Sequence, residues 1–233
     1  MIPAYITIRD YLSDQIAQGA IGLNEKLPSE RELVDRFTST RITVREALAK
    51  LEAEGVIYRS NRRGWFVSPP RLQYDPSTRI NFYKLAEQQG RTPSTKLLAL
   101  KKIKGPAEIR EKFGLANSKE KLIEATRVRF LEERPVLFEQ IYVVESRFPG
   151  LTKSDMEGSF TKLMDDNYGY KITSESNTIR VAALYDEEAE VLQLNAGAPC
   201  LNIHRQRNEK NGILLEYDVE YWVHSALEIC IGG

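Results

Sequence analysis

The chain has 233 residues, which is long for one domain and comfortable for two. It carries 33 Lys and Arg against 33 Asp and Glu, and this formal net charge of +0 argues against a protein that coats nucleic acid in bulk. Cys200 and Cys230 are the only cysteines and have apolar neighbours in the sequence, so no disulfide framework is expected. Because neither a leader pattern nor an apolar run of membrane-spanning length is found, we expect a cytoplasmic protein without a membrane partner.

The first predicted element is an amphipathic helix over residues 4–18. Tyr5, Ile8 and Leu12 recur at the spacing of one helix face. Gly19 follows the pattern and predicts the end of the helix. We expect this helix to pack across the next two.

A capping box predicts the start of the second helix. Ser29 is followed three residues later by Glu32, so each side chain can satisfy a backbone N–H that is free at a helix start. Leu33 and Phe37 then fall on the inner side of a short helix. The polar run 38–40 supplies a turn and the next N-cap.

A third helix is predicted from Arg41 to about Glu54. Val44 and Leu48 lie on its apolar stripe, whereas Arg41 and Arg45 lie off that stripe. Two helices joined by a short turn, the second with arginines and threonines facing outward, predict a helix-turn-helix that fits the DNA major groove.

A β-hairpin is predicted directly after these helices. Residues 56–59 and 64–67 have the pattern of short strands, and the turn between them contains Arg62 and Arg63. Such a wing brings guanidinium groups to phosphates or to a minor groove. The alternative is a small helical domain with solvated arginines. The capping box and the wing favour DNA binding.

The run LPSERELVDRFTSTRITVREALAKLEAEGVIYRSNRRGWFV, residues 27–67, resembles the DNA-binding domain of GntR-type transcription regulators almost without gaps. The resemblance implies phosphate and base contacts at the matching positions, to which the wing tip adds two arginines. The predicted DNA-binding residues are Arg31, Thr40, Arg41, Thr43, Arg45, Arg62, Arg63 and Gly64. Ile42 departs from the family pattern, and an apolar side chain there could touch a thymine methyl group.

Residues 68–79 are rich in proline and polar residues, which predicts a linker stiffened by Pro69-Pro70. The predicted organisation is therefore a winged helix-turn-helix domain over 1–68, a linker over 69–79 and a second domain over 80–233. In the second domain, helices are predicted over 81–89, 106–113, 160–167 and 186–194. Extended segments are predicted over 97–102, 121–131, 136–145, 171–183, 198–208 and 213–222. Hairpins between strands, with helices inserted, predict an antiparallel sheet in an α+β domain.

Charged residues interrupt several of these strands. Arg127 and Arg129 are two residues apart and therefore project from one face of a strand. Glu139 and Glu216 each follow an apolar run. Since a buried charge is costly unless it is paired, these residues either pair with one another or bind a charged ligand.

Residues 80–233 resemble the effector-binding, UTRA-like domain of the HutC branch of the same family. The resemblance rests on Thr-Arg-Val-Arg at 126–129, Pro-Val-Leu-Phe-Glu at 135–139, Gly-Ala-Pro at 197–199 and a late glutamate before an aromatic strand. It implies a sheet of the chorismate-lyase-like type whose cleft binds a small, often phosphorylated, metabolite. Matching ligand positions are Arg127, Arg129, Glu139, Ser159, Glu216 and Trp222. Thr161 and Trp222 stand where many members carry tyrosine.

The chemistry of these residues limits the ligand. Paired arginines suit a phosphate, phosphonate or carboxylate, and the helix start at Asn81, Phe82 and Tyr83 could add backbone donors for an anion. Glu139 and Glu216 could accept an ammonium group or sugar hydroxyls. The predicted effector-binding residues are Asn81, Phe82, Tyr83, Arg127, Arg129, Glu139, Ser159, Thr161, Glu216 and Trp222.

Two further segments, NFYKLAEQQGRTP at 81–93 and DVEYWVHSALEICI at 218–231, resemble the regulators of 2-aminoethylphosphonate utilisation. That compound is a zwitterion, with one anionic and one cationic end. A phosphorylated sugar or amino sugar is the alternative effector.

Catalysis is the alternative of another class, because the resemblance implies a lyase-like fold. His204 and His224 are the only histidines, and no acid–Ser–His spacing, metal motif or phosphate loop is found. We therefore predict a regulator, not an enzyme, without a cofactor or metal. The expected partners are a small anionic effector and a palindromic double-stranded DNA operator, which a homodimer would read as the repressor of a catabolic operon.

Overall fold

The structure, a computed structural model, describes residues 3–60 and 63–232. The chain forms two compact units: an N-terminal unit of Met1–Arg71 with His224–Glu228, and a C-terminal unit of Leu72–Val223 with Ile229–Gly233. Among the described residues, no helix is both long enough and apolar enough to cross a membrane.

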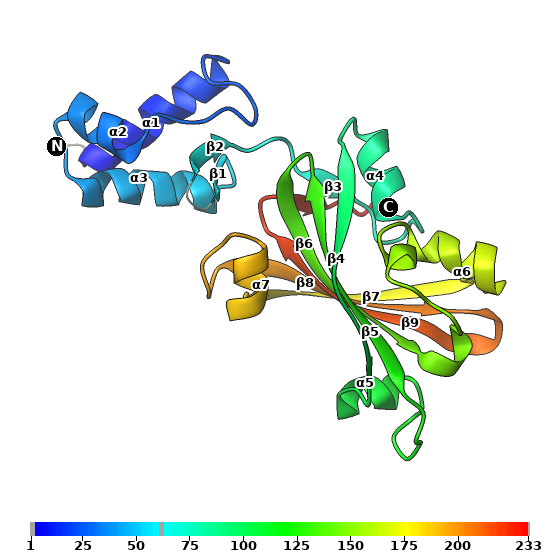
Figure 1. The fold of residues 1–233 in the computed structure, drawn as a ribbon. Coiled ribbons are helices and arrows are strands. Elements are labelled where there is room, and N and C mark those ends of the chain that lie inside the picture. Colours follow the sequence, from blue (N-terminus) through cyan, green and yellow to red (C-terminus); the bar gives the residue numbers. More distant parts are fainter. Residues whose placement is uncertain (1–2, 61–62, 233) are drawn as a thin grey trace. The chain divides into compact units, whose positions relative to one another are not determined.

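The N-terminal unit contains three helices and a two-stranded sheet (Figure 1). Their bounds are α1 (Ala4–Ala17), α2 (Glu30–Phe37), α3 (Arg41–Ala53), β1 (Ile57–Ser60) and β2 (Gly64–Val67). The predicted apolar faces form one core, because Ile8, Leu33 and Leu48 are all fully buried in it together with Trp65 of the hairpin. The predicted helix-turn-helix and its following hairpin are confirmed.

The capping box explains where α2 begins. The Glu32 backbone N–H donates to Ser29 Oγ at 3.2 Å, and the Ser29 backbone N–H donates to Glu32 Oε2 at 2.7 Å. Thr38 ends the helix with a positive φ of 47°. The Thr40 hydroxyl then accepts from the Thr43 backbone N–H at 3.2 Å and caps α3. These two caps hold the turn between the helices short.

The wing is a regular antiparallel hairpin from Ile57↔Val67 to Ser60↔Gly64. Gly64 has a φ of 111°, and a Cβ atom at this position would lie 3.0 Å from Lys26 Cε. Arg62, predicted at the wing tip, lies outside the described residues.

The C-terminal unit is built on a six-stranded antiparallel sheet in the order β4-β5-β6-β9-β8-β7. The strands are β4 (Pro93–Ile103), β5 (Leu122–Leu131), β6 (Arg134–Val144), β7 (Ser174–Ala183), β8 (Pro199–Asn208) and β9 (Leu214–Val223). The helices are α4 (Phe82–Gln88), α5 (Ala107–Lys112), α6 (Phe160–Tyr168) and α7 (Asp186–Val191). The turn between β8 and β9 contains Asn211 and Gly212, both with a φ of 75°, as their sequence predicts.

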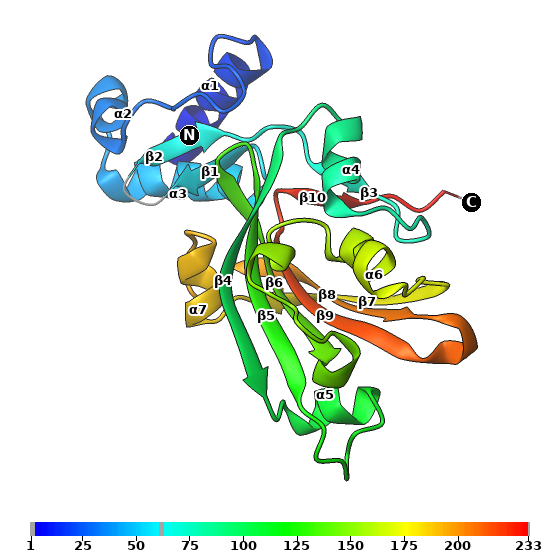
Figure 2. The same cartoon turned by 45° about the vertical axis from the view of Figure 1, so that its right-hand side comes forward.

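Helices cover both faces of this sheet (Figure 2). On one face, Phe160 and Met164 of α6 pack against Ile123 and Ile141. On the other face, Ile109 of α5 packs in a second core, whose sheet residues include Leu122, Tyr142, Tyr217 and Val219. Since side chains two residues apart share a face, the strand arginines and glutamates predicted as a site lie on the α6 face. The α+β fold is as predicted.

Two short strands were not predicted, β3 (Leu72–Tyr74) and β10 (Leu227–Ile229). The first lies inside the stretch that was predicted to be a linker. Its Leu72 and Tyr74 side chains are buried, and the Tyr74 carbonyl accepts from the Cys230 backbone N–H at 2.9 Å. A strand of this length between proline-rich segments gives too short an alternation to be distinguished from a linker.

Candidate functional site

The outer surface of α3 carries the predicted DNA-binding side chains. Arg41 and Arg45 are exposed, and Ile42 between them is 81% exposed. Thr40 and Thr43 lie at the N-terminus of the helix, where their hydroxyl oxygens are 2.9 Å apart. The surface therefore presents cationic, apolar and hydroxyl groups together, which are the groups that contact phosphates and base edges.

Two of the predicted DNA-binding arginines form ion pairs with acidic residues. Arg45 Nε lies 2.8 Å from Glu30 Oε2, and the Arg45 side chain remains 65% exposed. Arg31 Nε lies 4.0 Å from Asp35 Oδ2 on the surface of α2. Arg63 is exposed, and its guanidinium lies 5.3 Å from the centre of the Phe66 ring. Such exposed pairs contribute little to stability, so these arginines can exchange their partners for phosphates.

In the C-terminal unit, Arg127 and Arg129 of β5 both contact Glu139 of β6. Arg127 Nη2 lies 2.6 Å from Glu139 Oε2, and Arg129 Nη2 lies 3.0 Å from Glu139 Oε1. All three side chains are buried. Burial alone would raise the pKa of Glu139, but the two guanidiniums outweigh it and lower that pKa to about 2. The alternative in which these charges pair with one another is the one observed.

A second set of ion pairs lies on strands β7, β8 and β9. Arg205 contacts Glu175 at 2.6 Å and Glu220 at 2.9 Å. Arg207 contacts three carboxylates, those of Glu175 at 2.9 Å, Glu216 at 2.9 Å and Asp218 at 3.1 Å. These pairs join three strands, and together with Arg127, Arg129 and Glu139 they form one buried charged layer.

Sequence reasoning missed Arg205, Arg207 and Glu175 as members of the site. Arg205 and Arg207 are two residues apart in a strand, which is the same signal that identified Arg127 and Arg129. Glu175 gave no such signal, because it stands alone in a polar segment. Only the pairing of β7 with β8 brings it opposite Arg207.

Asp218 is the most unusual group in this layer, with an exposed fraction of 0%. Burial, together with the neighbouring charge of Glu216, raises the pKa of Asp218 well above its usual value, and Arg207 opposes this shift only in part.

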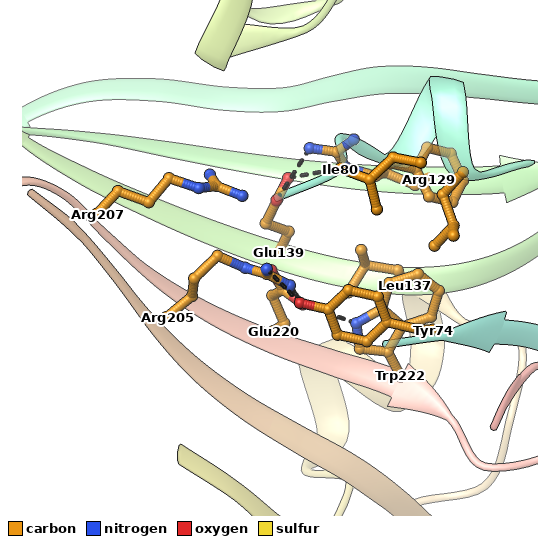
Figure 3. A pocket seen from close by; sticks show the side chains of 11 residues that line it. Tyr74, Ile80, Arg129, Leu137, Glu139, Arg205, Arg207, Glu220 and Trp222 are labelled. Atoms are coloured by element: carbon orange, nitrogen blue, oxygen red, sulfur yellow. Dashed lines mark hydrogen bonds and ion pairs between the residues drawn. The ribbon is translucent and has the colours of Figure 1, made fainter. Parts of the chain in front are cut away.

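Two cavities adjoin the charged layer. The first has a volume of about 30 Å³, enough for water-sized groups only. Figure 3 shows its lining residues, which are Tyr74, Ile80, Phe82, Leu85, Arg129, Leu137, Glu139, Arg205, Arg207, Glu220 and Trp222. The second has a volume of about 350 Å³, within the range of small-molecule sites. It is lined by Arg79, Ile80, Asn81, Thr161, Asp165, Tyr170, Lys171, Ile172, Glu175 and Arg207.

Aromatic residues close one end of the smaller cavity. The Trp222 indole N–H donates to Glu220 Oε2 at 2.7 Å. The Phe82 ring lies 6.0 Å from the Trp222 ring, and the Arg129 guanidinium lies 5.1 Å from the centre of the Phe82 ring. Phe82 thus lies beside Arg129, another predicted effector residue, and Trp222 lies beside Glu220, which was not in the predicted set.

The other predicted effector residues are placed as follows. Asn81 and Thr161 line the larger cavity, and Asn81 also caps α4 by accepting from the Lys84 backbone N–H. Ser159 caps α6, and the Tyr83 hydroxyl donates to the Glu157 carbonyl at 3.1 Å. Arg127 and Glu216 line neither cavity and contact their ion-pair partners instead.

The histidine in β8 has a structural contact. His204 Nδ1 lies 2.7 Å from the Tyr217 hydroxyl, and burial lowers the pKa of this histidine. This contact gives His204 a structural role in the sheet.

Comparison with known families covers nearly the whole chain. Residues 88–228 match the UTRA domain, and residues 4–67 match the family described as bacterial regulatory proteins, gntR family. The HTH-type transcriptional repressor NagR of Bacillus subtilis (strain 168) is 30% identical over 216 residues, which cover 93% of this chain and 88% of NagR. The probable fructoselysine utilization operon transcriptional repressor of Escherichia coli (strain K12) is 27% identical over 208 residues, covering 89% of this chain and 85% of that protein.

Solved structures share the fold. The crystal structure of PhnF from Mycobacterium smegmatis superposes with a TM-score of 0.68 at 22% identity, covering 97% of this chain and 98% of PhnF. The separate effector domain of PhnF superposes with a TM-score of 0.63 at 18% identity, covering 69% of this chain and 98% of that domain.

The two relatives named above are transcriptional repressors by name, and the families matched are those of regulators. The prediction of a regulator and not an enzyme is therefore confirmed. By its N-terminal helix-turn-helix and its C-terminal UTRA domain, the chain belongs to the GntR family of bacterial regulatory proteins, in the HutC-type branch.

Proposed function

We propose that this protein represses transcription by binding an operator in double-stranded DNA, and that a small zwitterionic or anionic metabolite controls the binding. The observation that carries the proposal is that one chain combines an exposed, arginine-bearing α3 with a buried charged layer beside two cavities.

The exposed residues of α3 suggest how DNA is read. Arg41 and Arg45 can donate to guanine edges or phosphates, and Ile42 can contact a thymine methyl group. Gly64 keeps the wing close to Lys26, which adds a further positive charge beside the hairpin. One such unit makes few contacts, so a homodimer on a palindromic operator would approximately double the binding free energy.

The charged layer is asymmetric, which suggests the effector class. On β5 and β6, two arginines face one carboxylate, that of Glu139. On β7, β8 and β9, Arg205 and Arg207 face four carboxylates. The layer therefore offers guanidiniums to an anionic group and an excess of carboxylates to a cationic group, so a zwitterion satisfies both.

2-Aminoethylphosphonate is our first candidate effector, because it is such a zwitterion. A phosphorylated sugar or amino sugar is the second candidate. It is favoured by the relative that is named for a fructoselysine utilization operon.

Isothermal titration calorimetry of the full chain against 2-aminoethylphosphonate and glucosamine 6-phosphate tests the effector assignment. We expect one of them to bind and Arg129→Ala to lose at least tenfold in affinity, because Arg129 lines the smaller cavity and the anion loses a forked donor. Arg180→Ala is the matched control, since Arg180 is an exposed arginine on β7 of the same sheet. No heat from either compound at millimolar concentration would refute the assignment.

A further inference from the structure

We propose that Glu139, Asp218 and Glu220 form a subsite for a primary ammonium group, which is the cationic end of the effector. One carboxylate oxygen from each residue lies within 4.8 Å of the other two. The three side chains are nearly inaccessible, with exposed fractions of 2%, 0% and 3% respectively. The inference rests on the proposed function and specifies which chemical group of the effector this part of the site binds.

The spacing of the three oxygens fits an ammonium group. An ammonium nitrogen has three N–H donors in tetrahedral directions and no acceptor. Charge-assisted N–H···O distances of about 2.8 Å place three accepting oxygens about 4.6 Å apart around the nitrogen. Three buried carboxylates at this spacing can therefore receive all three donors of one primary amine.

The charge of the layer favours one positive charge over two. The ion pairs join four arginines to five carboxylates, so the ionised layer has an excess of one negative charge. A primary ammonium group neutralises that excess. A divalent metal ion would exceed it and leave the layer with a net positive charge.

Two buried oxygens in the layer lack a donor among the described residues, Asp218 Oδ1 and Glu216 Oε1. A buried carboxylate oxygen without a donor is costly, so these atoms mark where a donor is missing. The charged groups that act on Asp218 are Glu216 and Glu220 on its own strand, Glu139 on β6 and Arg207 on β8, and three of these four are negative. Burial, together with these charges, raises the pKa of Asp218, and a bound ammonium group would lower it again, which favours release of a proton on binding.

The cavities allow a ligand of this shape. The 30 Å³ cavity touches Glu139 and Glu220 and has room for a group the size of water, such as an ammonium head. The 350 Å³ cavity shares Ile80 and Arg207 with it and has room for the rest of a small metabolite.

Calorimetry with two matched pairs of ligands tests the subsite. 2-Aminoethylphosphonate is compared with ethylphosphonate, and glucosamine 6-phosphate with glucose 6-phosphate, each in two buffers of different ionisation enthalpy. We expect the amine of one pair to bind at least tenfold more tightly than its partner and to release protons. Asp218→Asn should reduce this preference at least tenfold and abolish the proton release. It should leave the affinity for the amine-free ligand within threefold.

Asp166→Asn is the matched control, because Asp166 is exposed on α6, lines neither cavity and should keep the amine preference. Glu220→Gln provides a second variant and should also lose the preference. Equal binding of both members of a pair overturns the subsite and leaves the proposed effector response standing. Absence of binding by all four ligands overturns both. Saturable binding of Mg²⁺ alone, lost in Asp218→Asn, would also overturn the subsite by identifying a metal site.

Discussion

Glu139 is surrounded by two guanidiniums in a buried site, and its removal should be the most damaging single change in the charged layer. Glu139→Gln leaves Arg127 and Arg129 without a carboxylate, which typically costs about 3–5 kcal/mol in the free energy of unfolding. Urea denaturation of the C-terminal unit should show this loss. Glu145→Gln removes a carboxylate that contacts the exposed Lys102 at 2.6 Å, and it should destabilise the protein far less, because solvent screens this pair. Equal losses of unfolding free energy in Glu139→Gln and Glu145→Gln would contradict the claim that a buried ion pair matters more for stability than an exposed one.

Replacing Asp218 with a neutral side chain should stabilise the folded protein, whereas replacing Glu139 should destabilise it. Its pKa in the folded protein is raised above the unfolded value of about 3.9. The stability that its proton contributes is therefore complete below about pH 3.9 and is lost as the pH rises through the raised pKa. Asp218→Asn keeps a neutral side chain at every pH.

We therefore expect Asp218→Asn to be more stable than the wild type at neutral pH, by a margin that grows as the pH rises from about 4. Measuring the free energy of unfolding of both proteins in urea across this range tests the prediction. Glu139, whose pKa is lowered to about 2, contributes stability above about pH 4.3 that is lost toward pH 2, but it does so in both proteins. If the difference in unfolding free energy between Asp218→Asn and the wild type does not change with pH, the raised pKa of Asp218 is contradicted.

At the scale of elements, α3 should determine DNA affinity independently of the effector site. Arg45→Ala removes an exposed guanidinium that forms a surface ion pair with Glu30, so the fold should remain intact and specific DNA affinity should fall at least tenfold. Lys50→Ala is the control, since Lys50 is exposed in the last turn of the same helix. Fluorescence anisotropy with promoter DNA and calorimetry with the effector separate the two activities. Equal loss of both in Arg45→Ala would contradict modular function.

Some elements could be predicted from the sequence and others could not. Ser29 and Glu32 are local partners, and the helix that they cap was found because a cap needs only neighbours in the chain. Leu72 and Tyr74 form a strand only because a distant segment pairs with them, so their stretch has the composition of a linker. The pairing of Glu175 with Arg207 depends likewise on strand order, which composition does not encode.

The candidate site was predictable in part for the same reason. The spacing of Arg127 and Arg129 placed them on one face of a strand, and they do contact Glu139 together. Glu216 was predicted near this pair, but its contact is with Arg207 on the neighbouring strand β8. Residue periodicity fixes the face of a strand, whereas the partner is fixed by sheet order and register.

For the whole molecule, the central proposal is that an effector in the C-terminal unit changes how the N-terminal unit binds DNA. Such coupling requires the effector to bind one of two states of the protein more tightly than the other. By reciprocity, operator DNA must then change the affinity of the effector by the same factor. A homodimer would present two copies of α3 to the two halves of a palindrome.

The most direct measurement is the affinity of the full chain for DNA from its own promoter region, by fluorescence anisotropy at fixed salt, with and without a saturating effector found by calorimetry. We predict a change in affinity of at least fivefold, the lower end of typical coupling, that is lost in Arg129→Ala while DNA binding without effector is kept. An operator affinity that is the same with and without bound effector would contradict the account.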